Sequence, residues 1–227
     1  MLLFMFFLIL QTLDSESAAA PKANCQIKLN STLSTNSSWL SPSGRFAFGF
    51  YLEGSDGFKV GIQFIELPNK TTVIWTSHRD DSPVSKNATL MFGEGGLKLL
   101  LATSQGEDQN IVNLGQTSVY CASMLDSGNF VIYDNNNTVL WQTFDFPTDT
   151  LMVGQVLHKE TELISSVSEM NHSSGRFRLL MQFDGNLVMY PVGTDDNTVN
   201  AYWASYTASE PYDNLNLSQD GILFLTN

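Results

Sequence analysis

The stretch of sequence that decides the fold is LLMQFDGNLVMYP, residues 179–191. From residue 182 onward, every second position is Gln182, Asp184, Asn186, Val188 or Tyr190, and most of the positions between them are apolar. Alternate side chains of a β-strand share one face, so this spacing predicts that the five side chains point in one direction. The stretch therefore predicts a strand that carries a row of hydrogen-bonding groups interrupted by one valine.

The same stretch is one copy of a repeat. The pattern Leu/Met-x-x-Ser/Asp/Glu-Gly-x-Phe/Leu occurs five times, as LSPSGRF, MFGEGGL, MLDSGNF, MQFDGNL and LSQDGIL, around Gly44, Gly95, Gly128, Gly185 and Gly221. A polar residue followed by Gly between two apolar strands is typical of a hairpin turn. A second motif recurs as TVIWTS, TVLWQT and NAYWAS, around Trp75, Trp141 and Trp203. Repeated short strands with Gly turns predict an all-β repeat architecture.

The spacing of the repeats indicates two modules. The first three glycines form one group, and the last two form a second group that has one copy fewer. We expect a first domain over residues 24–147 and a second over residues 148–227. If three copies make a module, the second domain is incomplete in this sequence.

The N-terminal residues have the pattern of a secretory signal. An unbroken apolar run from Leu2 to Leu10 is followed by polar residues and three alanines, and the run is too short to span a bilayer. Residues 1–20 are therefore predicted to be a signal peptide, cleaved between Ala18 and Ala23. The protein is expected in the secretory pathway, outside the cell or on the outer face of the plasma membrane. No second long apolar run follows, so membrane anchorage is expected only through a segment beyond this chain.

Two other sequence features agree with that destination. The N-glycosylation formula Asn-x-Ser/Thr occurs at Asn30, Asn36, Asn69, Asn87, Asn136, Asn171 and Asn216, and each is expected on a surface loop. The chain contains 2 cysteines, Cys25 and Cys121, an even number in an oxidising compartment. They either form a disulfide or remain free, with Cys121 as a buried thiol in its apolar stretch.

The charge balance excludes one class of partner. The chain has 23 acidic and 11 basic residues, a formal net charge of −12. Nucleic-acid binding depends on Lys and Arg that neutralise phosphates, so no nucleic-acid partner is expected.

The polar row and three longer stretches resemble a known family. The row from Gln182 to Tyr190 agrees at all five positions with the mannose-binding signature of bulb-type lectins. SSWLSPSGRFAFGFY, MLDSGNFVIY and VLWQTFDFPTDTLMVGQ resemble the ectodomain of plant G-type lectin S-receptor-like serine/threonine kinases. Thr143 departs from the usual Ser, and Met152 with Val153 departs from the usual Leu-Pro. The resemblance implies a β-prism II fold of three four-stranded sheets, each contributing a core Trp. Full-length relatives continue into a transmembrane helix and a kinase.

The resemblance also implies a carbohydrate site at Gln182, Asp184, Asn186, Val188 and Tyr190. Asp184 and Asn186 would bind one axial hydroxyl of mannose, and Val188 would contact the C–H face. Affinity at such shallow sites is typically millimolar, roughly −4 kcal/mol. The other copies are degenerate, with Ser127 and Leu125 at the Asp and Gln positions and, in the last copy, Ser218, Ile222, Phe224 and Thr226 at four of the five. The row is thus either a working site or a remnant on a scaffold.

Enzymatic readings find little in the sequence. Asp126 to Asn129 resembles one Asp-Ser-Gly loop of an aspartic protease, but no second copy exists to share a proton. His78, His158 and His172 lack the spacing of metal ligands. We expect no enzyme, cofactor or metal, but a lectin whose partner is a mannose-type glycan or glycoprotein; a homodimer stays open. The rivals are an ectodomain that binds protein, with a vestigial sugar site, and a hydrolase on the same scaffold.

Overall fold

The computed structural model describes residues 25–227, except 56, 68–69 and 102–105. The predicted signal peptide and the sequon at Asn69 lie outside the described residues. Every described sheet is antiparallel, and the described helical structure is one 3₁₀ helix, η1 (Thr143–Asp145). Within these residues, no helix has the length and hydropathy needed to cross a membrane.

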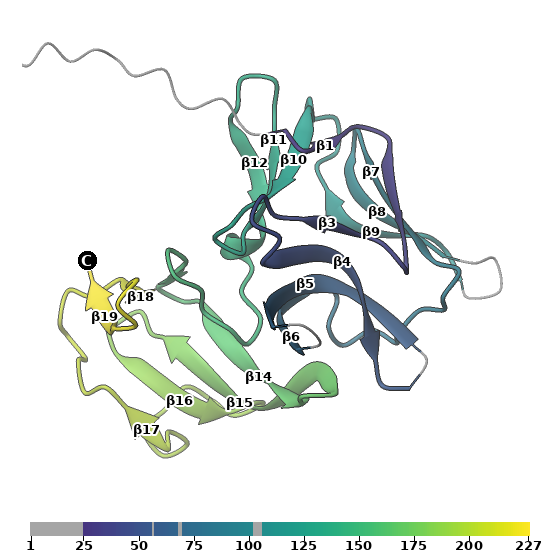
Figure 1. Ribbon diagram of the computed structural model, residues 1–227. Coiled ribbons are helices and arrows are strands. Elements are labelled where there is room, and N and C mark those ends of the chain that lie inside the picture. The colour runs from purple at the N-terminus through teal and green to yellow at the C-terminus, as the bar shows by residue number, and fades with distance from the viewer. Residues whose placement is uncertain (1–24, 56, 68–69, 102–105) are drawn as a thin grey trace, which may run out of the picture.

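Strands β1 to β12 form what we call the N-terminal module (Figure 1). Their four-stranded sheets have the orders β1-β10-β11-β12, β2-β7-β8-β9 and β3-β4-β5-β6. The strands are β1 (Ile27–Lys28), β2 (Ser31–Ser34), β3 (Ser38–Leu40), β4 (Phe46–Glu53), β5 (Gly57–Leu67), β6 (Lys70–Thr76), β7 (Thr89–Gly93), β8 (Gly96–Leu100), β9 (Gln109–Asn113), β10 (Cys121–Met124), β11 (Phe130–Tyr133) and β12 (Val139–Gln142).

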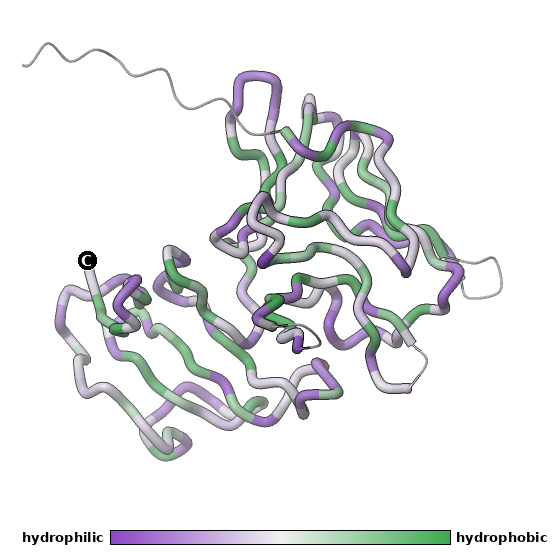
Figure 2. The backbone as a smooth tube through the Cα atoms, in the orientation of Figure 1, coloured by the Kyte–Doolittle hydropathy of each residue, from purple (hydrophilic) through white to green (hydrophobic). Residues whose placement is uncertain are grey.

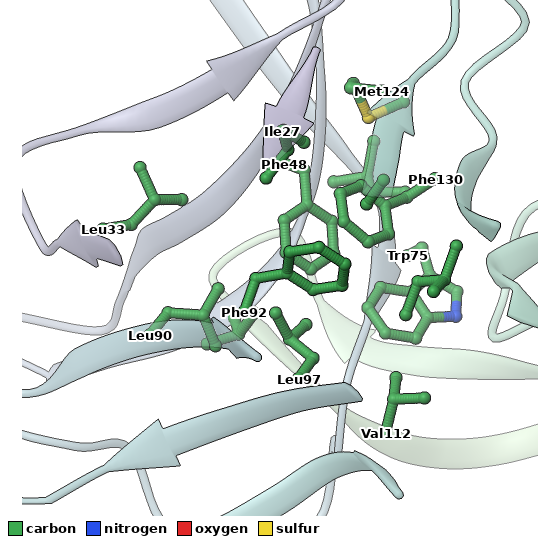
Figure 3. Packing of buried hydrophobic residues seen from close by; sticks show 14 of the residues in the cluster. Ile27, Leu33, Phe48, Trp75, Leu90, Phe92, Leu97, Val112, Met124 and Phe130 are labelled. Atoms are coloured by element: carbon green, nitrogen blue, oxygen red, sulfur yellow. The ribbon is translucent and has the colours of Figure 1, made fainter. Parts of the chain in front are cut away.

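The three sheets of the N-terminal module enclose one apolar core (Figure 3). Each sheet turns one face inward, because apolar side chains occupy alternate positions of its strands. Phe48 and Phe130, from two different sheets, stack with ring centroids 4.0 Å apart, and Phe92 of the third sheet is also fully buried. Three four-stranded sheets around a shared core are the arrangement of a β-prism II module, which confirms the predicted fold class.

Strands β13 to β19 form what we call the C-terminal module. In the described residues it consists of two sheets, β14-β15-β16-β17 and the three-stranded β13-β18-β19. The strands are β13 (Val156–His158), β14 (Glu162–Ser168), β15 (Asn171–Met181), β16 (Leu187–Pro191), β17 (Trp203–Ala204), β18 (Asn214–Leu217) and β19 (Leu223–Thr226). Hydrophobic residues follow the strands, and hydrophilic residues gather at connections such as the β11–β12 turn (Figure 2). The domain boundary between residues 147 and 148 stays a prediction.

Glycine builds four of the five repeated turns in the same way. Gly44, Gly128, Gly185 and Gly221 all have φ between 72° and 87°, a conformation that glycine adopts without a Cβ clash. Each donates its N–H to the carbonyl three residues earlier, at 2.8–3.1 Å. The fifth repeat differs, because in the β7–β8 turn the residue with positive φ is Gly96.

The disulfide between Cys25 and Cys121 is formed, with the two Cα atoms 5.5 Å apart. The pairing of β1 with β10 places the cysteines together, since Lys28 lies opposite Cys121 and Ile27 opposite Ala122. The bond closes a sequence separation of 96 residues and fastens the start of the described chain to the last sheet of the N-terminal module. The open alternative of a free buried thiol is therefore wrong.

The tryptophans depart from the expected one per sheet. Trp39 and Trp75 belong to the same sheet, and Trp141 belongs to β12. Trp75 pairs with Ile62 and Trp141 pairs with Ile132 across their strands. At the equivalent position of the β2-β7-β8-β9 sheet, Val112 pairs with Leu97, so this sheet has valine in place of tryptophan. Trp203 was expected in a core but is 45% exposed, whereas Trp75 is 8% exposed and lies against Trp141 of another sheet, with ring centroids 6.1 Å apart.

A buried polar cluster joins the two modules. Arg79 of the N-terminal module donates from Nε to the His172 carbonyl at 2.9 Å and from Nη1 to the Ile164 carbonyl at 2.7 Å. The Glu53 carboxylate, 5% exposed, accepts from the His172 backbone N–H at 2.7 Å and lies 2.8 Å from its ring Nδ1. The β14–β15 hairpin is thus fixed against β4, β5 and the segment after β6 (Figure 1).

The sequons differ in accessibility. The described asparagines at positions 30, 36, 87, 136 and 171 are exposed. Asn216 was expected on a loop, but it lies half-buried in β18, and its Nδ2 donates to Thr226 Oγ1 at 3.0 Å. Nδ2 is the atom to which a glycan would be attached, and Asn216 is therefore a less accessible sequon than the five exposed ones.

Candidate carbohydrate-binding site

The five residues of the polar row lie on a hairpin rather than along a single strand. Gln182, Asp184 and Asn186 belong to the turn between β15 and β16, and Val188 and Tyr190 belong to β16. The turn forms because Gly185 accepts positive φ and Gln182 pairs with Asn186 through its backbone N–H at 2.9 Å. A side chain at Gly185 would meet the Glu210 carbonyl at 2.3 Å, so the turn also requires glycine for space.

Exposure divides the row into two parts. Asp184 is exposed, and Gln182 and Asn186 are half-buried. Val188 and Tyr190 are each 2% exposed and pack with Leu180 and the two alanines Ala201 and Ala204. The expected single exposed face therefore applies to the turn, where three polar side chains reach solvent, and not to β16.

Asn186 is held by the segment that follows β17. Its Oδ1 accepts from Ser205 Oγ at 3.0 Å and from the Thr207 backbone N–H at 3.2 Å. Ser205 Oγ in turn accepts from the Leu187 backbone N–H at 2.9 Å. Within the described residues, Asn186 Nδ2 has no hydrogen-bond partner, so this side chain offers a fixed donor to a ligand.

Tyr190 is placed to orient Gln182. Gln182 Nε2 donates to the Tyr190 hydroxyl at 2.9 Å, which leaves Gln182 Oε1 as an acceptor. Burial raises the pKa of Tyr190 above its usual value, opposed by the hydrogen bond from Gln182, so the phenol stays protonated at neutral pH. The guanidinium of Arg178 lies over the Tyr190 ring, 5.0 Å from its centroid, in a cation–π contact.

The turn gathers complementary groups for a sugar hydroxyl. Asp184 Oδ1 accepts from the Asn186 backbone N–H at 3.1 Å, and its second carboxylate oxygen has no partner in the described chain. A hydroxyl both donates and accepts, so it can donate to the Asp184 carboxylate and accept from Asn186 Nδ2. The arrangement can bind a polyhydroxylated ligand.

The N-terminal module contains a similar asparagine clasp, by which we mean an Asn Oδ1 that accepts from a hydroxyl and a backbone N–H of a later segment, but its Nδ2 donor is occupied. Asn129 Oδ1 accepts from Thr143 Oγ1 at 3.1 Å and from the Phe144 N–H at 3.2 Å, as Asn186 does from Ser205 and Thr207. Asn129 Nδ2, however, donates to Gln142 Oε1 at 2.9 Å, and Asn129 is only 6% exposed. Ala204 follows Trp203 where Gln142 follows Trp141, and alanine leaves the Asn186 donor free.

The copy at Gly221 keeps the acid of the row and has lost the other four residues. Asp220 is exposed, but Ser218 Oγ accepts from the Ile222 backbone N–H at 3.1 Å within the turn. Ile222 and Phe224, at the positions of Asn186 and Val188, are 60% and 42% exposed. This turn presents apolar surface rather than convergent polar groups.

Three supporting residues were not identified from the sequence. Ser205 had a signal, because the recurring Trp motif places Thr143 two residues after Trp141 and Ser205 two residues after Trp203. Thr207 and Arg178 had no sequence signal. The Thr207 backbone N–H contacts Asn186, and the Arg178 guanidinium contacts the Tyr190 ring, only because the fold brings these segments together.

The histidines have structural partners. His158 Nδ1 lies 2.8 Å from Asn214 Oδ1, and His172 contacts Glu53. Across the described ranges, no group of three His, Cys, Asp or Glu side chains is arranged to hold a metal ion.

Comparison with known proteins places this geometry in a family. Residues 72–164 match the family model described as D-mannose binding lectin. A G-type lectin S-receptor-like serine/threonine-protein kinase of Oryza sativa subsp. japonica is 36% identical over 219 residues, which is 90% of this chain and 26% of that protein. The chain contains a bulb-type lectin domain.

Other relatives agree with this assignment. A second such kinase, from Oryza sativa subsp. indica, is 34% identical over 89% of this chain, and one from Arabidopsis thaliana is 32% identical over 78%. This bulb-type lectin chain spans about a quarter of the length of the rice relatives, 26% in each case, and the aligned part is their lectin region. The model match ends before residue 182, so the polar row lies outside it.

Solved structures of lectins also resemble parts of the chain. A domain-swapped lectin dimer from Mycobacterium smegmatis is 29% identical and covers 35% of this chain and 62% of its own, with a TM-score of 0.28. A Marasmius oreades lectin is 18% identical over 81% of this chain and 91% of its own, with a TM-score of 0.16. At such TM-scores the fold assignment rests on the sheets themselves.

Proposed function

We propose that this chain is a carbohydrate-binding module that recognises mannose-type glycans through Gln182, Asp184 and Asn186. The observation that carries the proposal is the β15–β16 turn, where a free carboxylate oxygen and a free amide donor stand two residues apart on a rigid support. Tyr190 acts as a positioning residue for Gln182, and Val188 supports the sheet beneath the site. Hydrogen bonds to an ionised acceptor are the stronger kind, so Asp184 contributes most.

We further propose that the chain is the extracellular, ligand-binding part of a receptor-like kinase. The exposed sequons and the Cys25–Cys121 disulfide support passage through an oxidising compartment. The aligned relatives are named as receptor-like kinases. An ectodomain that binds protein is the second candidate, favoured by the exposed apolar residues Ile222, Leu223 and Phe224 of the degenerate copy.

The test is a single substitution at the turn. Asp184→Asn keeps the size of the side chain and removes its charge, which should cost about 1.5–3 kcal/mol of binding free energy. Against a total of roughly 4 kcal/mol for a millimolar site, mannose binding then falls below detection. Saturation-transfer NMR with mannose measures it, and circular dichroism checks folding.

Ser127→Ala in the degenerate copy is the matched control, because Ser127 occupies the position of Asp184 in a turn of the same geometry. It should leave the mannose signal unchanged. Equal signals from wild type and Asp184→Asn would refute the site. A folded wild-type chain that binds no sugar would favour the protein-binding candidate.

A further inference from the structure

The segment that follows β17 contains one more residue than its counterpart in the N-terminal module. In the N-terminal clasp, the hydroxyl and the N–H that bond Asn129 Oδ1 come from consecutive residues, Thr143 and Phe144. In the clasp of the β15–β16 turn, the hydroxyl of Ser205 and the N–H of Thr207 take these roles. One residue therefore stands between the two donors in the C-terminal module, and it has no equivalent in the N-terminal module.

The additional residue, Tyr206, has a strained backbone and an exposed ring. Its φ of 61° lies in the left-handed region, which a bulky residue adopts only at a cost. The hydrogen bonds of its two neighbours to Asn186 hold it in this conformation. Its side chain is 89% exposed and has no hydrogen-bond, ring or ionic partner within the described ranges. Strained residues of this kind gather at ligand-binding sites, so Tyr206 is a candidate ligand contact.

The position of Tyr206 puts its ring within reach of a ligand on Asn186. Both sequence neighbours of Tyr206 bond the Oδ1 of this amide, whose Nδ2 is free in the described structure. The segment is fixed to the same turn a second time, because the Thr207 hydroxyl donates to the Gly185 carbonyl at 2.8 Å. Tyr206 is thus rooted beside Asp184 and Asn186, the two residues that would bind one sugar hydroxyl.

The site needs an apolar group that the row itself does not supply. A hexose has C–H faces as well as hydroxyls, and its hydroxyls exchange bonds to water for bonds to protein at a modest net gain. Val188, which the resemblance assigns to the C–H face, is 2% exposed and closed to a ligand. Phe183, in the turn, is 74% exposed, but Lys159 Nζ lies over its ring, 5.3 Å from the centroid. Tyr206 is the more exposed ring and has no cation over it in the described chain.

We propose that Tyr206 is a further binding residue of the carbohydrate site, whose ring packs against the C–H face of a hexose while Asp184 and Asn186 bind its hydroxyl. The inference rests on the proposed function of the turn. Tyrosine suits this role, because its flat ring offers a large apolar contact and loses little rotamer freedom on binding. A contact of this kind strengthens binding about two- to tenfold.

The test follows the protons of mannose by NMR while residue 206 is changed. With the wild-type chain, C–H protons of bound mannose should shift upfield, because an aromatic ring packed against them shields them. Tyr206→Gly removes the ring and suits the positive φ. The upfield shift should disappear and the dissociation constant should rise about two- to tenfold, without a fall in the unfolding midpoint. Tyr206→Phe keeps the ring and should retain the shift and the affinity. Tyr202→Ala, an exposed tyrosine that packs on Phe177, is the matched control and should behave as wild type.

The possible results distinguish Tyr206 from the turn. Mannose binding that is lost in Asp184→Asn but unchanged in Tyr206→Gly would overturn the role of Tyr206 and leave the turn as the site. Upfield shifts that persist in Tyr206→Gly and disappear in Phe183→Ala would assign the contact to Phe183 instead. Weaker binding in Tyr206→Gly with a lower unfolding midpoint and unchanged shifts would show a purely structural role. Failure of the folded wild-type chain to bind mannose would overturn both proposals.

Discussion

The sheets β3-β4-β5-β6 and β14-β15-β16-β17 have equivalent strand pairings, but their side chains differ in burial. Phe48, Ile62 and Trp75 lie side by side across β4, β5 and β6, as Leu179, Met189 and Trp203 do across β15, β16 and β17. The first trio is 0%, 0% and 8% exposed, while Trp203 is 45% exposed. The difference teaches that the same strand pattern produces a closed core only where a third sheet covers it.

The two asparagine clasps make a second comparison between the modules. Asn129 and Asn186 each accept from a hydroxyl two residues after a Trp and from a nearby backbone N–H, yet of the two only Asn186 keeps a free Nδ2 donor among the described residues. The clasp is therefore part of the architecture, and ligand binding is an additional use of it. The difference comes from one neighbouring side chain, because Gln142 accepts from Asn129 Nδ2 and Ala204, at the equivalent position, has no acceptor for Asn186 Nδ2.

The largest effect should come from the core of the covered sheet. Phe48→Ala removes a fully buried ring and should lower the free energy of unfolding by about 3–5 kcal/mol. Leu179→Ala, at the same register position, should cost clearly less, because its surroundings are half-open. Urea denaturation monitored by tryptophan fluorescence measures both. Equal losses would show that the C-terminal sheet is covered in solution.

The module junction should respond next. Arg79→Ala leaves the Ile164 and His172 carbonyls and the Asp149 carboxylate without their cationic donor, and should cost about 3 kcal/mol, as breaking a buried ion pair does. We expect the single unfolding transition to separate into two. Arg176→Ala, an exposed arginine of β15, is the control and should change neither. A single unshifted transition for Arg79→Ala would show that the buried polar cluster does not couple the two modules.

A third test rebuilds the missing site in the N-terminal module. Leu125→Gln and Ser127→Asp restore the polar positions, and Gln142→Ala frees Asn129 Nδ2. In a chain whose own site is removed by Asp184→Asn, the triple substitution should restore mannose binding at about millimolar affinity, roughly 4 kcal/mol. The chain with Leu125→Gln and Ser127→Asp alone is the control, since Gln142 still occupies the donor. Equal signals from both would show that Gln142 does not block the site.

The smallest effect concerns pH at the junction. Hydrogen bonds from the Ser174 backbone N–H and hydroxyl, each 2.7 Å, lower the pKa of Asp80 below its usual value. A lowered pKa contributes stability that is complete above the unfolded value, about 4, and is lost as pH falls through the folded value. Unfolding midpoints should thus decline as pH falls below about 4, and less steeply in Asp80→Asn. Parallel pH profiles for the two proteins would exclude this contribution.

Much of the fold and part of the site followed from local chemistry. Gly128, Gly185 and Gly221 mark turns because only glycine adopts their backbone conformation at no cost, and alternating apolar residues define strands whatever they pack against. The sequence placed the row from Gln182 to Tyr190 on one strand face, whereas the structure divides it between a turn and the buried β16, and its role as a sugar site stays a prediction. Local patterns are legible in sequence because they depend on residues a few positions apart.

Tertiary structure alone decided the rest. The pairing of β1 with β10 selected the disulfide between two outcomes that the sequence left open. Burial of Tyr190 under Arg178, the block at Asn129 by Gln142 and the exposure of Trp203 all depend on side chains brought together from separate strands. A sequence pattern states which side chains share a face of a strand, and the packing of sheets determines which of those faces meets solvent, another sheet or a ligand.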